Sequence, residues 1–279
     1  MHGLEIHVDF LKIMRFVLFM PRMCASFHIC IHYLNVYENR FLDSFRDWFR
    51  GYESNYAVIG GTACDLLMSE AEMDFRLTRD IDMVLIVEAL SPEFGTRFWE
   101  YIKAAGYEHR RKSTNTPIYY RFSNPKSSEY PSMIELFSRR LEGIELPPDA
   151  VLTPLPLEDS LSSLSAILLD DDYYEFMKSG VKVVGDIPIL DAPYLIPFKA
   201  KAWLDLSARK ALGEQIDSKN IKKHKRDIIR LYELLVIGVE IELPQKVKSD
   251  LLSFVSANIA DNIDELLHIA DYYGIREDL

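Results

Sequence analysis

The chain has 279 residues, of which 48% are hydrophobic, and its formal net charge is −11. That length and apolar content can bury the core of one large domain or two ordinary ones. The negative charge repels phosphate backbones at long range, which argues against general coating of nucleic acid and leaves only a locally basic cleft for such a partner. The three cysteines show neither zinc nor CxxC spacing, so we expect no disulfide scaffold and favour a reducing, cytoplasmic setting.

An apolar stretch at residues 10–35 comes first along the chain. Lys12, Arg15 and Pro21 interrupt it, whereas a membrane-spanning helix needs about 20 mostly apolar residues without a break. A signal peptide begins with basic residues, whereas acidic residues precede this stretch. We therefore expect no membrane span and interpret the stretch as an extra helix or a loosely attached segment. A peripheral contact with a membrane or a partner is the alternative.

Helices and strands are predicted to alternate in the next part of the chain. Aromatic residues at helical spacing predict the first helix, short apolar runs predict strands, and Gly106 is typical of a helix C-cap. In chain order, the predicted elements are a helix in 36–52, a strand at 56–61, a helix start at 62–70, a strand at 80–87, a helix at 93–106, and strands at 118–122 and 132–138. This order predicts an α/β (α+β) fold, in which helices pack on a sheet.

Four prolines in 143–159 mark the best candidate boundary. Short strands are predicted after it, at 165–169 and at 181–190, the second with a turn near Gly185 and Asp186. Helical patterns follow at about 194–212, 218–236, 245–258 and 262–274. We therefore divide the chain into an N-terminal extension (1–35), an α/β domain (36–145), connecting strands that complete or flank the sheet (146–192), and a C-terminal helical domain (193–279).

Three acidic residues are the first candidates for chemistry. Successive side chains of a strand point to opposite faces, so Asp80 and Asp82 share one face while Ile81 points into the core. Two carboxylates that close repel each other, and one stays protonated unless a cation neutralises the pair. Glu135 supplies a third carboxylate from an apolar strand if the two strands are neighbours. Oxygen ligands suit Mg²⁺ or Mn²⁺, so the three acids predict a metal site for phosphoryl transfer.

Two adjacent glycines precede the aspartates. Gly60 and Gly61 end a predicted strand and lead into a helix, where their backbone N–H groups can approach a phosphate closely. The helix N-terminus adds a partial positive charge, and the Thr62 hydroxyl can donate to a terminal phosphate oxygen. Paired glycines often mark a plain turn. Their position ahead of the two aspartates is what favours a phosphate site.

Together these motifs resemble a known family. GGTA at 60–63, RLTRDID at 76–82 and MIELF at 133–137 are similar to the GG[ST]A, RxTxDID and h[DE]h pattern of the DNA polymerase β-like nucleotidyltransferase superfamily. Their spacing resembles its bacterial AbiEii toxin-like branch. FKAKAWLDLSARK at 198–210 and KKHKRDIIRLYELL at 222–235 match the C-terminal motifs of that branch more loosely, so the resemblance covers roughly residues 40–235.

The resemblance implies a nucleotidyltransferase-type mixed sheet with flanking helices, in which 36–145 would be the catalytic domain and a helical region would follow. It also implies roles for the first motifs. Gly60, Gly61 and Thr62 would bind the triphosphate of a nucleoside triphosphate, Asp80 and Asp82 would ligate Mg²⁺, and Glu135 would complete the site near the attacking hydroxyl.

The resemblance assigns further residues to the C-terminal motifs. Lys199 or Lys201 would neutralise the triphosphate, and Asp227 would belong to a helical motif beside the cleft. The two lysines point to different sides of a helix. We favour Lys199, because Lys201 can extend over Trp203. Arg230 stands where the branch has a second acid, so no role that needs both acids is carried over.

A basic stretch accompanies these motifs. Residues 199–230 hold ten Lys or Arg and only four acids, which suits phosphate binding, although a solvated helix face is an equal interpretation for Lys222, Lys223 and Lys225. Arg76 could bind the nucleotide and brace the carboxylates, or form an ordinary surface salt bridge. His224 is a candidate ligand or base, but surface histidines are more common. We interpret Asp170–Asp172 as a solvated helix start.

The leading hypothesis is therefore Mg²⁺-dependent transfer of a nucleoside monophosphate from NTP to an acceptor hydroxyl. The acceptor could be an RNA end such as tRNA, a protein side chain or a small molecule. The resemblance also implies a toxin with a cognate antitoxin partner. The alternative is a catalytically silent nucleotide-binding or regulatory module of the same fold, against which the intact Asp80, Asp82 and Glu135 argue.

Overall fold

A computed structural model describes residues 40–76, 78–107, 119–137, 170–236, 238–239 and 241–279. Residues 41–279 cluster into one compact unit. The predicted extension at 1–35, the proline-rich boundary at 143–159 and the strand at 165–169 lie outside the described residues. The division into domains therefore stays a prediction.

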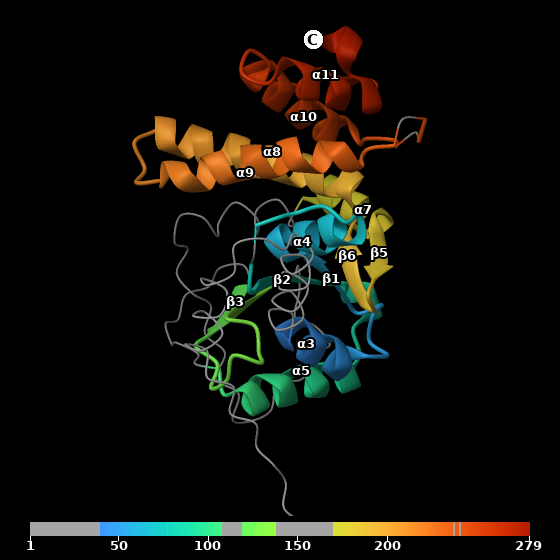
Figure 1. Cartoon of the computed structure of the whole chain (residues 1–279), viewed down its shortest axis with the longest axis vertical. Helices are drawn as coiled ribbons and strands as arrows, with labels where there is room; N and C mark the ends of the chain where they lie inside the picture. Colours follow the sequence, from blue (N-terminus) through green and yellow to red (C-terminus); the bar gives the residue numbers. More distant parts are fainter. Residues whose placement is uncertain (1–39, 77, 108–118, 138–169, 237, 240) are drawn as a thin grey trace, which may run out of the picture. The chain divides into compact units, whose positions relative to one another are not determined.

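A mixed sheet carries the fold, and in the described part of the chain it has six strands in the order β3-β4-β2-β1-β6-β5 (Figure 1). The strands are β1 (Tyr56–Ile59), β2 (Asp80–Leu85), β3 (Tyr119–Ser123), β4 (Met133–Phe137), β5 (Val181–Val184) and β6 (Ile187–Leu190). β1 is antiparallel to β2 and parallel to β6, while β4 is parallel to β2 and antiparallel to β3. The predicted α/β architecture is thus confirmed, with both halves of the chain contributing strands to one sheet.

Local sequence signals set several element ends. α5 (Pro92–Ala105) begins with Ser91, which accepts a hydrogen bond from the Phe94 amide, and ends at Gly106 with φ +65°. This left-handed residue is the predicted C-cap. β5 and β6 form an antiparallel hairpin around Gly185 and Asp186, whose φ angles are +53° and +62°. Positive φ at both central residues suits a two-residue hairpin, which confirms the turn predicted there.

Helices cover both faces of the sheet (Figure 1). α3 (Arg40–Phe49) and α5 lie on one side, where their aromatic rings pack together; the Phe49 and Phe94 centroids are 6.0 Å apart. α4 (Gly60–Glu70) lies on the other side and buries its Ala63, Cys64 and Leu67 side chains. Burial of such apolar side chains supplies the main favourable term of folding.

The C-terminal part is helical, as predicted. Asp170 caps α7 by accepting hydrogen bonds from two backbone amides, which confirms that these acids form a helix start. The helices are α7 (Asp171–Ser179), α8 (Ala192–Ala211), α9 (Ser218–Leu231), α10 (Gln245–Asn258) and α11 (Ile263–Tyr272). α8 packs against α9, α10 and α4. The pattern predicted to end at 236 stops as an α-helix at Leu231 and continues as a 3₁₀ turn at Tyr232–Leu234.

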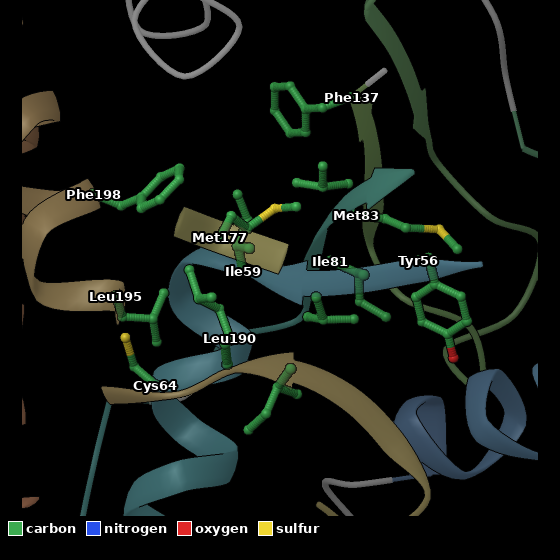
Figure 2. Packing of buried hydrophobic residues seen from close by; sticks show 14 of the residues in the cluster. Tyr56, Ile59, Cys64, Ile81, Met83, Phe137, Met177, Leu190, Leu195 and Phe198 are labelled. Atoms are coloured by element: carbon green, nitrogen blue, oxygen red, sulfur yellow. The ribbon is translucent and has the colours of Figure 1, made fainter. Parts of the chain in front are cut away.

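A buried core joins α4 and α8 to the sheet (Figure 2). Ile59 of β1, Ile81 of β2, Cys64 of α4 and Leu195 of α8 are each at most 2% exposed. Close packing of this kind resists small displacements, so it fixes these elements relative to one another. None of the helices among the described residues combines the length and apolar character needed to cross a bilayer.

Candidate functional site

A cavity of about 250 Å³ opens between the sheet, the start of α4 and the paired helices α8 and α9. Its volume is near the lower end of the range for small-molecule sites. The sheet contributes carboxylates to the lining, the α4 start contributes glycines, and the two helices contribute cations and apolar side chains. One wall of the cavity therefore carries three carboxylates, and the helical wall carries the cations Lys199 and Lys223 among apolar and uncharged polar side chains.

The acidic wall consists of Asp80, Asp82 and Glu135, which all line the cavity. Asp80 and Asp82 are partly exposed while Ile81 between them is fully buried, so the predicted alternation is confirmed. β2 and β4 are neighbours, and their register sets Asp82 directly opposite Glu135. The three acids predicted to share one site are therefore brought together.

Burial and the negative charge of Glu135 change the pKa of the two aspartates. Burial, followed by the negative charge and a hydrogen bond of Glu135, raises the pKa of Asp82 to about 8. Burial and the charge of Glu135 also raise the pKa of Asp80. Carboxylates that close cannot all ionise without a compensating cation. Without a compensating cation, the raised pKa of Asp82 favours its protonated form near neutral pH.

Arg121 of β3 is a site residue that the sequence analysis missed. It lies opposite Glu135 in the β3–β4 register, and its Nε and Nη2 atoms lie 2.9 and 2.8 Å from Glu135 Oε1. Such a two-pronged, charge-assisted contact fixes the carboxylate as well as neutralising it. Alternation along β3 could have placed Arg121 on the same face of the sheet as the acids. That inference needs the register between β3 and β4, which the sequence does not give.

The donor set fits a divalent metal in type. Three carboxylates on one cavity wall supply the oxygen ligands that Mg²⁺ and Mn²⁺ prefer. Within the described residues, however, no three His, Cys, Asp or Glu side chains surround a single point closely enough to hold a metal. The three side chains would therefore have to move closer together to surround one ion.

Gly60 lies against the acidic wall for a steric reason. Its φ is +72°, and a Cβ atom there would lie 1.7 Å from Asp82 Oδ2. A Cβ on Gly61 would lie 3.0 Å from Arg76 Nη2. Ile59 precedes α4 without a side-chain cap. The helix start thus presents backbone N–H groups beside Asp82, which is the arrangement that accommodates an anionic oxygen.

Thr62 corrects one prediction. Its hydroxyl, expected to donate to a phosphate, instead donates to the Asp80 backbone carbonyl at 2.6 Å. The side chain is 1% exposed and does not line the cavity. A buried hydroxyl needs an internal partner, and the carbonyl at the start of β2 supplies it. Thr62 therefore fastens α4 to β2 and positions Asp80 rather than contacting a ligand.

Lys199 is the buried cation of the site. It lines the cavity from α8, is 5% exposed, and donates from Nζ to Asp227 Oδ2 at 2.7 Å. Arg76 donates to both oxygens of the same carboxylate, at 3.3 and 3.1 Å. Burial opposes ionisation of Asp227, but Lys199 and Arg76 outweigh it and hold the pKa of Asp227 at about 2. The sequence analysis favoured Lys199 over Lys201 as the nucleotide-binding lysine, and the position of Lys199 in the cavity lining is consistent with that choice.

Asp227 and Arg76 do not line the cavity themselves but contact residues that do. Arg76 was predicted to bind the nucleotide and brace the carboxylates, or to form an ordinary salt bridge. The structure shows an ion pair with Asp227, through which Arg76 also supports the ammonium of Lys199. Cys64 lies beside them, and burial raises the pKa of its thiol to about 11, so the neutral thiol donates to the Gly60 carbonyl at 3.0 Å. These residues act on the site by positioning Lys199 and Gly60.

Lys201 was the less favoured of the two candidate nucleotide-binding lysines, and the structure places it away from the cavity. Its Nζ pairs with Asp205 at 3.1 Å and with Asp250 at 3.5 Å, and it is not part of the cavity lining. The two-residue offset from Lys199 turns it to another side of α8, as helical geometry requires. There it joins α8 to α10.

α9 contributes further polar side chains to the lining. Asn220, Lys223 and His224 line the cavity at helical spacing. Lys223 has no ion-pair partner among the described residues, and burial together with Arg76 and Lys199 lowers its pKa. Asn220 was not anticipated from the sequence, although it lies one helical turn before His224. Arg230, further along α9, pairs with Glu233 and donates to the Asp74 carbonyl.

Comparisons with known proteins add no assignment: no protein-family model matches the chain, and no curated protein matches it.

Proposed function

We propose that the protein is a Mg²⁺-dependent nucleotidyltransferase of the DNA polymerase β-like superfamily, in its AbiEii toxin-like branch. It moves a nucleoside monophosphate from NTP onto an acceptor hydroxyl and releases pyrophosphate. The observation that carries the proposal is the contact between the double-glycine helix start and the acids: Gly60 has room for no side chain because Asp82 fills that space, and Glu135 lies opposite Asp82.

In this proposal the two walls of the cavity divide the work. Asp80, Asp82 and Glu135 hold Mg²⁺, which neutralises phosphate oxygens and makes a hydroxyl more acidic when it is bound. The amides of Gly60 and Gly61 receive the triphosphate. Lys199, held in place by Asp227, adds a fixed positive charge on the opposite wall. Catalysis then consists of positioning and charge neutralisation, as phosphoryl transfer requires.

The acceptor stays open among an RNA end such as tRNA, a protein side chain and a small molecule. Lys219, Lys222 and Arg226 are exposed on α9 and favour a polyanion such as RNA. The net charge of −11 favours a small or locally bound acceptor. A toxin role with a cognate antitoxin, and a cytoplasmic location, belong to the same proposal.

A silent nucleotide-binding module is the second candidate. The observation that favours it is the ion pair between Arg121 and Glu135, which occupies one oxygen of a proposed metal ligand. Both candidates bind NTP, but only the enzyme releases pyrophosphate. Pyrophosphate release therefore separates them.

The test has two stages. Thermal melting is measured with and without Mg²⁺ and each NTP, for the wild type, Asp82→Asn and the control Asp47→Asn, which changes an exposed acid on α3. We expect NTP with Mg²⁺ to raise the Tm of the wild type and the control but not that of Asp82→Asn. Absence of a shift in the wild type contradicts both candidates.

The second stage incubates the protein with labelled NTPs and total cellular RNA. Label on RNA, on protein or on a small molecule identifies the acceptor, and Asp82→Asn should abolish it. An NTP-induced shift in Tm without label transfer or pyrophosphate release would favour the silent module.

A further inference from the structure

Part of the cavity lining is apolar, and most of that part comes from α8. Leu195, Phe198 and Ala202 line it from one face of α8, at the spacing that aligns residues along a helix. Phe137 of β4 lines it from the sheet. Figure 2 shows the rings of Phe137 and Phe198 extending toward each other from these two elements. The cavity therefore offers apolar ring surface in addition to its charged side chains.

Two uncharged polar side chains from α9 also line the cavity. Asn220 and His224 are four residues apart, so they lie on one side of the helix and both line the cavity. His224 Nδ1 is buried and has no hydrogen-bond partner among the described residues. Buried polar atoms are nearly always paired, and an unpaired one costs about 1–3 kcal/mol. A ligand with a complementary polar edge would remove that cost.

His224 is neutral at physiological pH. Burial, followed by the positive charge of Lys199, lowers the pKa of its imidazole to about 3. A neutral imidazole both donates and accepts hydrogen bonds, as does the amide of Asn220. These groups are poorly suited to a phosphate, which favours cationic partners. They suit an uncharged, flat ligand that carries donors and acceptors on its edge.

The geometry points to a nucleobase subsite: we propose that Asn220 and His224 hydrogen-bond the edge of the purine or pyrimidine base of the bound NTP while Phe198 contacts its apolar ring. The assignment rests on the proposed function, because it uses the triphosphate at Gly60 and Lys199 to direct the base toward α9. Ring contacts of nucleobases with aromatic side chains tolerate any base. Discrimination between bases therefore falls to Asn220 and His224.

The test separates base binding from triphosphate binding. Affinities for each Mg²⁺–NTP and for Mg²⁺–tripolyphosphate, which has no base, are measured by calorimetry on the full chain. The variants are His224→Ala and Asn220→Ala, with Ile221→Ala as a neutral control on the same helix that does not line the cavity. We expect each site variant to weaken its preferred NTP about tenfold, the equivalent of one lost hydrogen bond. Affinity for tripolyphosphate should stay within about twofold, by the same arithmetic.

The outcomes are distinguishable. If the wild type binds neither NTP nor tripolyphosphate, the proposed function fails and the subsite with it. If the wild type binds NTP and both site variants keep full NTP affinity, the subsite is refuted while the proposed function stands. Equal weakening of NTP and tripolyphosphate also refutes it, because the residues would then serve the triphosphate. Loss of acceptor labelling with unchanged NTP affinity would assign Asn220 and His224 to the acceptor instead, and would overturn the inference. Two variants are used so that misfolding of one leaves the other to decide.

Discussion

The buried carboxylate of Asp227 should be far more sensitive to substitution than the lysine it binds. Asp227→Asn keeps the shape of the side chain but leaves Lys199, whose side chain is 6% exposed, without an acid. Removing one partner of a buried ion pair costs about 3–5 kcal/mol, because the other charge stays buried and uncompensated. We expect a loss of that size in the free energy of unfolding.

Lys199→Met perturbs the same pair from the other side, with a different result. Asp227 keeps Arg76, which donates to both of its oxygens, so no bare charge remains. The loss is then about that of one charge-assisted hydrogen bond, about 1.5–3 kcal/mol, and burial of the apolar Met side chain offsets part of it. Asp227→Asn should therefore exceed Lys199→Met by about 2 kcal/mol, from the difference of these ranges.

Urea denaturation of both variants measures the difference directly, provided that the slope of the transition is unchanged. Lys201→Met is the matched control on the same helix, because its ion pairs are partly exposed and such pairs contribute about 0–1 kcal/mol. If Lys199→Met were as destabilising as Asp227→Asn, Arg76 would not be compensating Asp227. The account of the network given above would then be wrong.

Three further substitutions probe the acids, the glycine turn and a helix cap. Gly60→Ala should displace Asp82 and abolish the proposed NTP binding. The control Gly51→Ala shares a positive φ but has nothing within 4 Å of its added Cβ, so it should lower the free energy of unfolding by only about 1 kcal/mol. Equal effects of the two variants in melting and binding assays would refute the steric argument. The raised pKa of Asp82 gives stability that is present below the unfolded value near 3.8 and is lost as pH rises through about 8. Without metal, Asp82→Asn should therefore gain on the order of 2 kcal/mol over the wild type between pH 6 and pH 8, and parallel pH profiles would contradict this. Asp170→Ala should lower stability by about 1 kcal/mol, through the lost cap of α7, and an unchanged urea midpoint would argue against that role.

The features predicted correctly are those that depend on neighbours in the sequence. Alternation along a strand placed Asp80 and Asp82 on one face, and the special backbone freedom of Gly106 marked the end of α5. The turn at Gly185 and Asp186 follows from the same local reasoning. Such signals act over a few residues, so one sequence suffices to detect them.

The features missed depend on contacts between distant segments. The Thr62 hydroxyl is bound by a carbonyl 18 residues away, and Arg76 and Asp227 are separated by 151 residues. Arg121 meets Glu135 only through the register of two strands. No local pattern fixes these partners, because each depends on which elements become neighbours in the sheet and in the α8–α9 pair.

The order of segments along the chain has a consequence for synthesis on the ribosome. By the time β4 has emerged, the nascent polypeptide already carries all three carboxylates of the acidic wall, but α8 and α9 are still to be made. Arg76 has no Asp227 to brace at that stage, and Lys199 does not yet exist. The catalytic chemistry proposed for this protein would therefore stay switched off until translation has passed α9.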